Sequence, residues 1–209
     1  LRIGPIFLPI TGEIEQEYCQ QQEVNFDELP EVHQIDGFMN SESHHLLLFK
    51  YQDSASAASM PEGLRIVSLT GGTTSFDGNK DLTGAWQDDA EIHLPAGTAI
   101  FWDKNTVLDF NYHLKNYNNP GVLPCDFYLN IAYKNRPVNT STIEMKSALI
   151  NNATLFLLPG QQTKYYNDNS NGKNETRNIW MMSSHTHKFG TYFDIHKKDN
   201  AKPNQLGDT

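Results

Sequence analysis

The segment Val107-Leu108-Asp109-Phe110-Asn111-Tyr112-His113-Leu114 is a strongly strand-like run near the middle of this 209-residue chain, and it decides the fold class. On both sides of it, short runs rich in β-branched and aromatic residues recur between clusters of Gly, Pro, Asn and Asp. We find no stretch longer than about ten residues with the apolar period of a helix. We therefore expect an all-β chain.

The expected strands are the apolar runs between these turns: 2–8, 17–23, 44–51, 63–69, 91–94, 99–102, 107–117, 125–133, 144–150, 153–158, 179–187 and 190–196. Short strands separated by such frequent turns favour β-sandwiches or a jelly roll. The polar connection 134–141 is the best domain boundary, because it places charge, Pro and Asn between two apolar runs. We place an N-terminal domain at 1–135 and a C-terminal domain at 136–209.

The composition excludes some functions. A formal net charge of −9 argues against a nucleic-acid surface, which needs clustered Lys and Arg. No apolar run approaches the roughly 20 residues of a membrane span, so we expect none. The chain opens at Leu1 rather than Met, and we expect that a leader or an earlier segment has been removed.

Cys19 and Cys125 have no CxxC partner, which excludes a zinc knuckle, and their pairing stays open.

Two histidine pairs are the candidate metal ligands, since neutral imidazole is the commonest side-chain ligand for copper and zinc. His44-His45 opens an apolar run, and His185 and His187 flank one threonine. Residues two apart share a strand face at roughly 6.5–7 Å, so His185 and His187 can hold one ion. A tandem pair points to opposite faces. His44 and His45 can therefore reach one ion only at a strand end or a bulge, or through different ring nitrogens.

Each pair needs a further ligand. His113 is the leading candidate for the tandem pair, because its strand can cross beside them in a sheet. Met181 lies on the same strand face as His185 but roughly 13 Å away, which is too far for a shared ion. A structural role stays open for both pairs, and we interpret the other histidines considered as ordinary surface or core residues: His33, His93 and His196.

Five segments in chain order resemble the copper type II, ascorbate-dependent monooxygenases, the family of peptidylglycine α-hydroxylating monooxygenase and dopamine β-monooxygenase. They are Ser43-His44-His45-Leu46-Leu47-Leu48-Phe49, Gly84-Ala85-Trp86 with Leu94-Pro95-Ala96-Gly97, the strand ending at His113, Leu158-Pro159-Gly160, and His185-Thr186-His187-Lys188-Phe189-Gly190. Order and approximate spacing agree with the family over roughly residues 14–196. The late Trp-Met-Met-Ser-Ser-His-Thr-His stretch is closer to bacterial secreted relatives, which implies a secreted or periplasmic protein.

The resemblance implies two jelly-roll β-sandwich domains, each with one mononuclear copper site. His44, His45 and His113 match the ligands of the electron-transfer copper, and His185 and His187 match two ligands of the oxygen-binding copper. In that family ascorbate is the reductant, and O₂ is used to hydroxylate a C–H bond of a small-molecule or peptide substrate. The resemblance therefore implies a copper- and ascorbate-dependent monooxygenase, or its N-terminal portion, with two copper ions.

The chain also departs from the family. The family's thioether ligand lies beyond its His-Thr-His block, whereas the last methionine here is Met182, so the third ligand of the second copper is not found in this chain. We expect an incomplete second domain, completed by further sequence or by another chain. These departures keep two alternatives open. One is a non-catalytic copper-binding or copper-carrying module on the same scaffold; the weaker one is a cupin-like zinc or iron protein, which lacks a Glu after His185 at cupin spacing.

Overall fold

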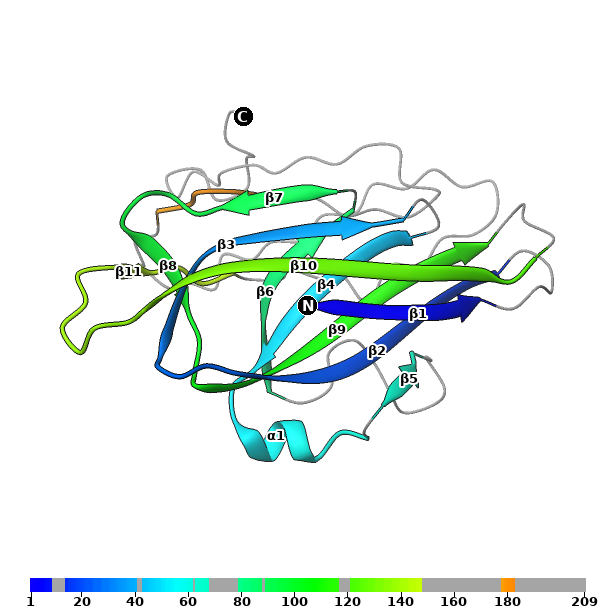
Figure 1. The fold of residues 1–209 in the computed structure, drawn as a ribbon, viewed down its shortest axis with the longest axis horizontal. Coiled ribbons are helices and arrows are strands. Elements are labelled where there is room, and N and C mark those ends of the chain that lie inside the picture. The colour runs from blue at the N-terminus through cyan, green and yellow to red at the C-terminus, as the bar shows by residue number, and fades with distance from the viewer. Residues whose placement is uncertain are drawn as a thin grey trace, which may run out of the picture. The chain divides into compact units, whose positions relative to one another are not determined.

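A computed structural model describes residues 1–8, 14–40, 43–61, 63–67, 79–87, 89–116, 121–147 and 178–182 (Figure 1). Strands dominate these residues, with one short helix, α1 (Ser54–Ala58), so the all-β prediction is confirmed. Within the described part no helix is long and apolar enough to cross a membrane. Of the expected strand 179–187 only 179–182 are described, and these residues form no strand.

The first compact unit, Leu1–Leu149, contains two β-sheets. The six-stranded sheet runs in the order β1 (Arg2–Leu8), β10 (Leu123–Asn135), β3 (Pro30–Met39), β8 (Thr98–Phe101) and β11 (Ile143–Glu144), with β7 (Ala90–His93) also paired to β3. The five-stranded sheet runs in the order β5 (Leu64–Ile66), β2 (Ile14–Asn25), β9 (Asn105–Asn116), β4 (Ser43–Tyr51) and β6 (Lys80–Trp86). Among the described strands, every pairing is antiparallel except that of β11 with β8.

The antiparallel pairs are nested along the chain. Strand β1 pairs with β10, β2 with β9, β3 with β7 and β8, and β4 with β6. Early strands therefore pair with late ones, and the innermost pair is closest in sequence. Because β10 also pairs with β3 and β9 with β4, successive nested pairs fall alternately into the two sheets.

Strand β9 contributes four residues to the hydrophobic core. Its alternate residues Leu108, Phe110, Tyr112 and Leu114 are fully buried and belong to the core cluster. Val32, Ile35, Phe127 and Leu129 join the same cluster from the six-stranded sheet, so the inward side chains of both sheets meet in one core. The intervening β9 residues Asp109, Asn111 and His113 face away from this core, as the period of two requires.

Two strands, β3 and β6, were not among the expected segments. In β3, Tyr133 pairs with Val32 and Ala132 with Gln34, so His33 is an extra residue and the alternation of buried residues slips by one. Strand β6 begins with two charged residues, Lys80 and Asp81, and carries Gly84. An alanine Cβ at Gly84 would lie 2.2 Å from Cη2 of Trp86, so this glycine leaves room for the buried indole.

The first unit extends beyond the boundary expected between residues 135 and 136. The backbone N–H of Arg136 donates to the carbonyl oxygen of Leu29 at 2.7 Å. Further along, the Thr140 and Thr142 hydroxyls donate to the Glu31 carboxylate. Strand β11 then pairs with β8, so the polar connection is tied to the strands that precede it. The compact units divide at Leu149 and Ile150, and residues 178–182 are the described part of the second unit.

A buried ionic cluster ties the edges of the five-stranded sheet to β9. Asp109, which is fully buried, pairs with Arg65 of β5 at 2.7 Å and with Lys80 of β6 at 2.6 Å. The Tyr51 hydroxyl donates to the same carboxylate at 3.2 Å. Burial, with the neighbouring Asp109 carboxylate, raises the pKa of Tyr51, so the phenol stays protonated as a donor.

The two cysteines are thiols that are not joined to each other. Cys19 pairs in register with Asn111 on the face of the sheet away from the core, and the Asn111 amide donates to its sulfur at 3.4 Å. Cys125 belongs instead to the core cluster. Burial raises the pKa of the Cys19 thiol, which keeps it protonated at neutral pH.

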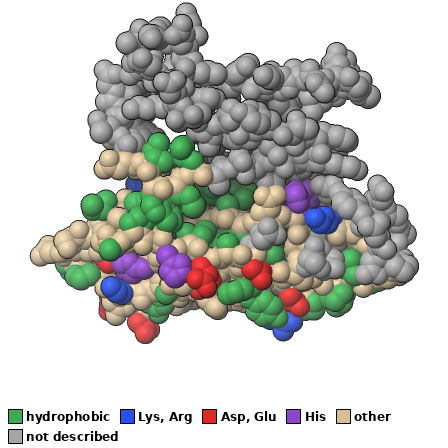
Figure 2. All heavy atoms as spheres, turned by 90° about the horizontal axis from the view of Figure 1, so that it is seen from above, with side chains coloured by type: hydrophobic (Ala, Val, Ile, Leu, Met, Phe, Trp, Pro, Cys, Tyr) green, Lys and Arg blue, Asp and Glu red, His purple; other side chains and the backbone are tan. Residues whose placement is uncertain are grey.

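Charged side chains are dispersed among the described residues on the face seen in Figure 2. On the face seen in Figure 2, the described residues carry a few separated Lys and Arg side chains between acidic, apolar and neutral polar ones. This distribution agrees with the net charge of −9 and offers no extended basic stripe on that face.

Candidate metal centre

A β-bulge places the tandem histidines. In the pairing of β4 with β9, Ser43 lies opposite Leu114 and His45 opposite His113. Two steps along β4 thus match one step along β9, and His44 is the extra residue. The bulge removes the strict alternation that would send His44 and His45 to opposite faces. The hydrogen bonds of Ser43 to Asn40, from its backbone N–H at 3.0 Å and its hydroxyl at 2.9 Å, hold the start of β4 just before the bulge.

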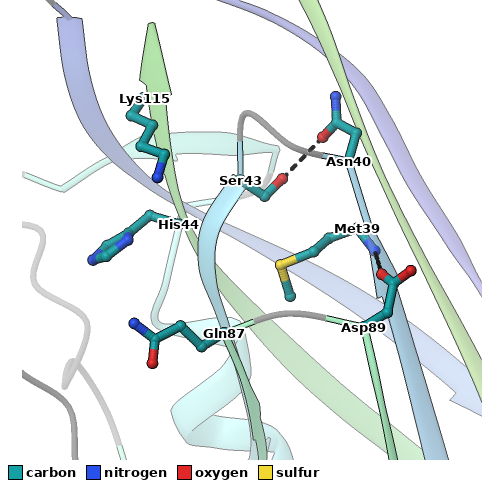
Figure 3. Close-up of a pocket in the computed structure, with 7 residues that line it drawn as sticks. All are labelled: Met39, Asn40, Ser43, His44, Gln87, Asp89 and Lys115. Carbon is teal, nitrogen blue, oxygen red and sulfur yellow. Dashed lines mark hydrogen bonds between the residues drawn. The ribbon is translucent and has the colours of Figure 1, made fainter. Parts of the chain in front are cut away.

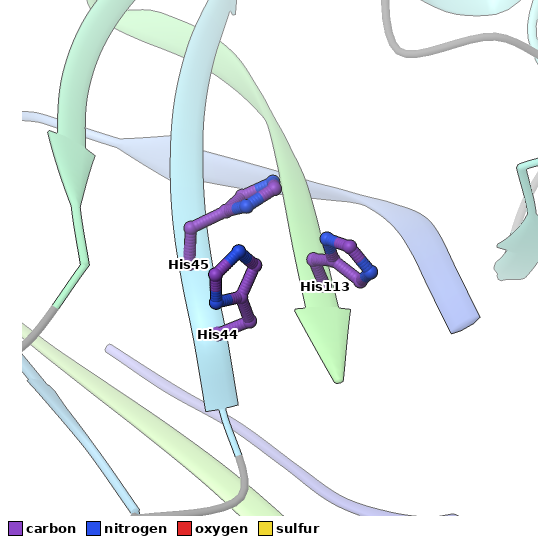
Figure 4. Close-up of side chains that lie close together, drawn as sticks. All are labelled: His44, His45 and His113. Atoms are coloured by element: carbon purple, nitrogen blue, oxygen red, sulfur yellow. The ribbon is translucent and has the colours of Figure 1, made fainter. Parts of the chain in front are cut away.

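The three imidazoles lie together at the end of β9. Figure 4 shows the rings of His44, His45 and His113 turned toward one another. Their centroids are 5.6 Å apart for His44 and His45, 5.1 Å for His44 and His113, and 5.0 Å for His45 and His113. His45 and His113 are buried and His44 is half-buried.

This arrangement fits a metal ion. One nitrogen from each ring can be chosen so that all three lie within 4.8 Å of one another. Nitrogens bonded to one ion at about 2.0–2.1 Å lie about 3.3–4.2 Å apart, so small ring rotations close the remaining gap. Three neutral imidazoles suit copper, zinc and other borderline ions. Because His44 is only half-buried, a further ligand could approach from its side.

One carboxylate lies beside the three rings. Glu17 of β2 is directly opposite His113 in the pairing of β2 with β9. Its Oε1 is 3.8 Å from Nε2 of His45, which belongs to the strand on the other side of β9. The Glu17 side chain is 30% exposed and that of His45 is 6% exposed, so this carboxylate is the solvent-side partner of a buried ring.

A polar pocket of about 550 Å³ adjoins the cluster on the side of His44. It is lined by Met39, Asn40, Ser43, His44, Gln87, Asp89 and Lys115. In Figure 3 the side chains of His44, Gln87 and Lys115 extend toward a common space from three segments of the chain. Asp89 accepts a hydrogen bond from the Met39 backbone N–H at 2.7 Å and so fixes one wall of the pocket. A small molecule in this pocket would contact His44 directly.

The structure also groups Asp36, Glu91 and His93 on β3 and β7, with one possible donor atom from each within 4.8 Å of the others. Asp36 already accepts two hydrogen bonds of 2.9 Å from Gln34, and Glu91 lies 3.0 Å from His93. Glu91 and His93 are exposed, and each of the three side chains already has a polar partner on the protein. We interpret the group as a solvated surface cluster, in line with the ordinary role expected for His93.

The expected site residues thus have different outcomes. His44, His45 and His113 are brought together from segments far apart in the chain. His185 and His187 lie outside the described residues. Sequence reasoning missed Glu17 and Lys115, because neither belongs to a ligand motif and only strand register places them beside the histidines.

The comparisons with known proteins give no relative. No protein-family model, no curated protein and no solved structure matches this chain. The residues and their geometry therefore carry the functional argument alone.

Proposed function

We propose that this chain is a copper protein whose electron-transfer site is formed by His44, His45 and His113. We further propose that it acts, outside the cytoplasm, as a copper- and ascorbate-dependent monooxygenase or as the N-terminal portion of one. The observation that carries the proposal is the bulge at His44, which brings one nitrogen from each of three imidazoles within 4.8 Å of the others where a regular strand would separate two of the rings.

The fold of the first unit supports the proposal. A jelly roll forms when a long antiparallel hairpin folds over into two sheets, which gives nested strand pairs. The pairs β1–β10, β2–β9, β3 with β7 and β8, and β4–β6 are nested in this way. A first jelly-roll domain carrying the histidine site is the architecture that the family resemblance implies.

The chain's own residues would hold the ion and control access to it. His45 and His113, both buried, would form the inner side of the site, and half-buried His44 would face the pocket. Bound copper would supply one-electron redox chemistry, which zinc would not. Lys115 and the amide of Gln87, which share this pocket with His44, would orient a small anionic reductant such as ascorbate.

Copper stoichiometry tests the site. Replacing His113 by Ala should remove about one equivalent of copper from the purified chain, because two imidazoles cannot complete a three-nitrogen site. His93→Ala is the matched control, since it removes an exposed imidazole in the other candidate cluster and should change nothing. Unchanged binding in His113→Ala, or loss of one equivalent in His93→Ala, would contradict the assignment.

The alternative is a non-catalytic copper-binding or copper-carrying module on the same scaffold. It is favoured by one observation: no methionine follows His187 in this sequence, so the thioether that the family places beyond its His-Thr-His block is not found in it. Ascorbate-dependent oxygen uptake distinguishes the two functions. The monooxygenase predicts uptake that depends on copper and is lost in His113→Ala and in His187→Ala, whereas the carrier predicts tight copper binding without uptake.

A further inference from the structure

Glu17 is a charged side chain beside the buried His45 ring of the histidine cluster. It sits on β2, in a row across three adjacent strands in which Glu17 lies opposite His113 and His113 lies opposite His45. All three residues face away from the hydrophobic core. Strands two positions apart are separated by about 9–10 Å, so the glutamate side chain must extend across His113 to come within 3.8 Å of Nε2 of His45.

We propose that Glu17 is a positioning residue for the metal site, and this inference rests on the copper site proposed above. Its carboxylate lies 3.8 Å from Nε2 of His45, and a small shift of either side chain would let it accept a hydrogen bond from that nitrogen and leave the other ring nitrogen for the ion. Its negative charge would favour the more highly charged oxidation state. A carboxylate on the outer nitrogen of a ligating imidazole is a recurrent arrangement that fixes the ring and raises its basicity.

Burial separates this contact from an ordinary surface ion pair. A solvent-exposed pair contributes little, because water screens it and two side chains must be ordered. Here the His45 side chain is only 6% exposed, so the Glu17 carboxylate approaches a ring that has lost most of its water. Three neutral imidazoles also leave the full charge of the ion unbalanced. Glu17 supplies one negative charge beside it, on the solvent-facing side of His45.

The test compares Glu17→Gln with Glu23→Gln. Both variants remove one negative charge from the same face of β2, but Glu23 pairs in register with Val107, at the other end of β9 from the histidines. The measurements are the affinities for Cu(I) and Cu(II), by competition with chelators of known affinity, the reduction potential, and the paramagnetic resonance spectrum of the Cu(II) form. We expect Glu17→Gln to weaken Cu(II) binding by about tenfold or more, as removal of a partner behind a ligand does.

Cu(I) binding should weaken less than Cu(II) binding, so the reduction potential should rise and the Cu(II) spectrum should change. Glu23→Gln should match the original chain in each measurement. Glu17→Asp, which keeps the charge but shortens the reach, should recover part of the Cu(II) affinity. Unfolding of the metal-free variants shows whether any loss comes from the fold instead.

The outcomes separate the two proposals. If the original chain binds copper and His113→Ala does not, the site exists, and equal Cu(II) affinity and potential in Glu17→Gln and Glu23→Gln would overturn the role of Glu17 alone. If the original chain does not bind copper, the site and the role of Glu17 both fall. If Glu17→Gln lowers the Cu(II) affinity but changes neither the paramagnetic resonance spectrum nor the reduction potential, the positioning role would also be overturned.

Discussion

The strongest stability prediction concerns Asp109→Asn in the buried ionic cluster. Asp109 is fully buried, and the side chains of its cationic partners Arg65 and Lys80 are 4% and 2% exposed. The amide has nearly the shape of the carboxylate, so the variant removes charge without making a cavity. Two buried cations would then face a neutral group, at pair distances of 2.7 and 2.6 Å.

The magnitude follows from that loss. Removing one partner of a buried ion pair costs about 3–5 kcal/mol, because an uncompensated charge stays buried. Domains are stable by only about 5–15 kcal/mol, so Asp109→Asn should remove about a fifth or more of the free energy of unfolding of the first unit. Lys80→Met should lower the free energy of unfolding by at least about 2 kcal/mol less than Asp109→Asn does. The remaining Arg65–Asp109 pair has no net charge, so no uncompensated charge stays buried.

Reversible urea unfolding, followed by the fluorescence of the buried Trp86 and Trp102, measures these differences. Asp103→Asn is the matched control. Its pair with Lys50 has a similar length, 3.1 Å, but Asp103 is 62% exposed, so the expected cost is about 1 kcal/mol or less. A cost for Asp109→Asn no larger than that of Asp103→Asn would refute the reasoning, as would a cost for Lys80→Met equal to that for Asp109→Asn.

Two further predictions concern the fold. Hydrogen bonds from the Thr140 and then the Thr142 hydroxyls lower the pKa of Glu31 below its ordinary 4.5, although burial opposes the shift. The ionised carboxylate therefore stabilises the fold fully above about pH 4.5, and this contribution is lost as the pH falls through the pKa of the folded state. The difference in unfolding free energy between the original chain and Glu31→Gln should shrink on acidification. A difference that does not change with pH would contradict this. Gly84→Ala should lower the free energy of unfolding by about 1–3 kcal/mol, because the new Cβ would overlap the Trp86 indole. A urea midpoint equal to that of the original chain would rule out the overlap.

Much of the strand content is predictable from local sequence. The expected segments 2–8, 44–51 and 107–117 agree with β1, β4 and β9 to within a few residues, because β-branched and aromatic side chains favour the extended backbone locally. Strands β3 and β6 escape the same reasoning. A bulge at His33 interrupts the alternation in β3, and β6 contains Lys80, Asp81 and Gly84, residue types that are rare in strands.

The candidate site also contains some residues that can be recognised from the sequence and others that cannot. Its three imidazoles could be named from the chain, because tandem histidines and a histidine in a strand-like run are visible as residue types. Glu17 and Lys115 carry no such signal, since their relevance depends on which strand lies beside which. The role of His185 and His187 stays a prediction, as these residues lie outside the described part of the chain.

The sequence by itself determined that this protein is built from strands and that imidazole is its candidate ligand, because backbone propensity and ligand chemistry belong to single residues and their neighbours. Tertiary structure alone decided that three of those imidazoles share one space. The register of β4 against β9 leaves His44 as an extra residue and sets His45 opposite His113, and the register of β2 adds Glu17 to the row. Such registers result from packing a whole sheet against one core, which no short segment encodes.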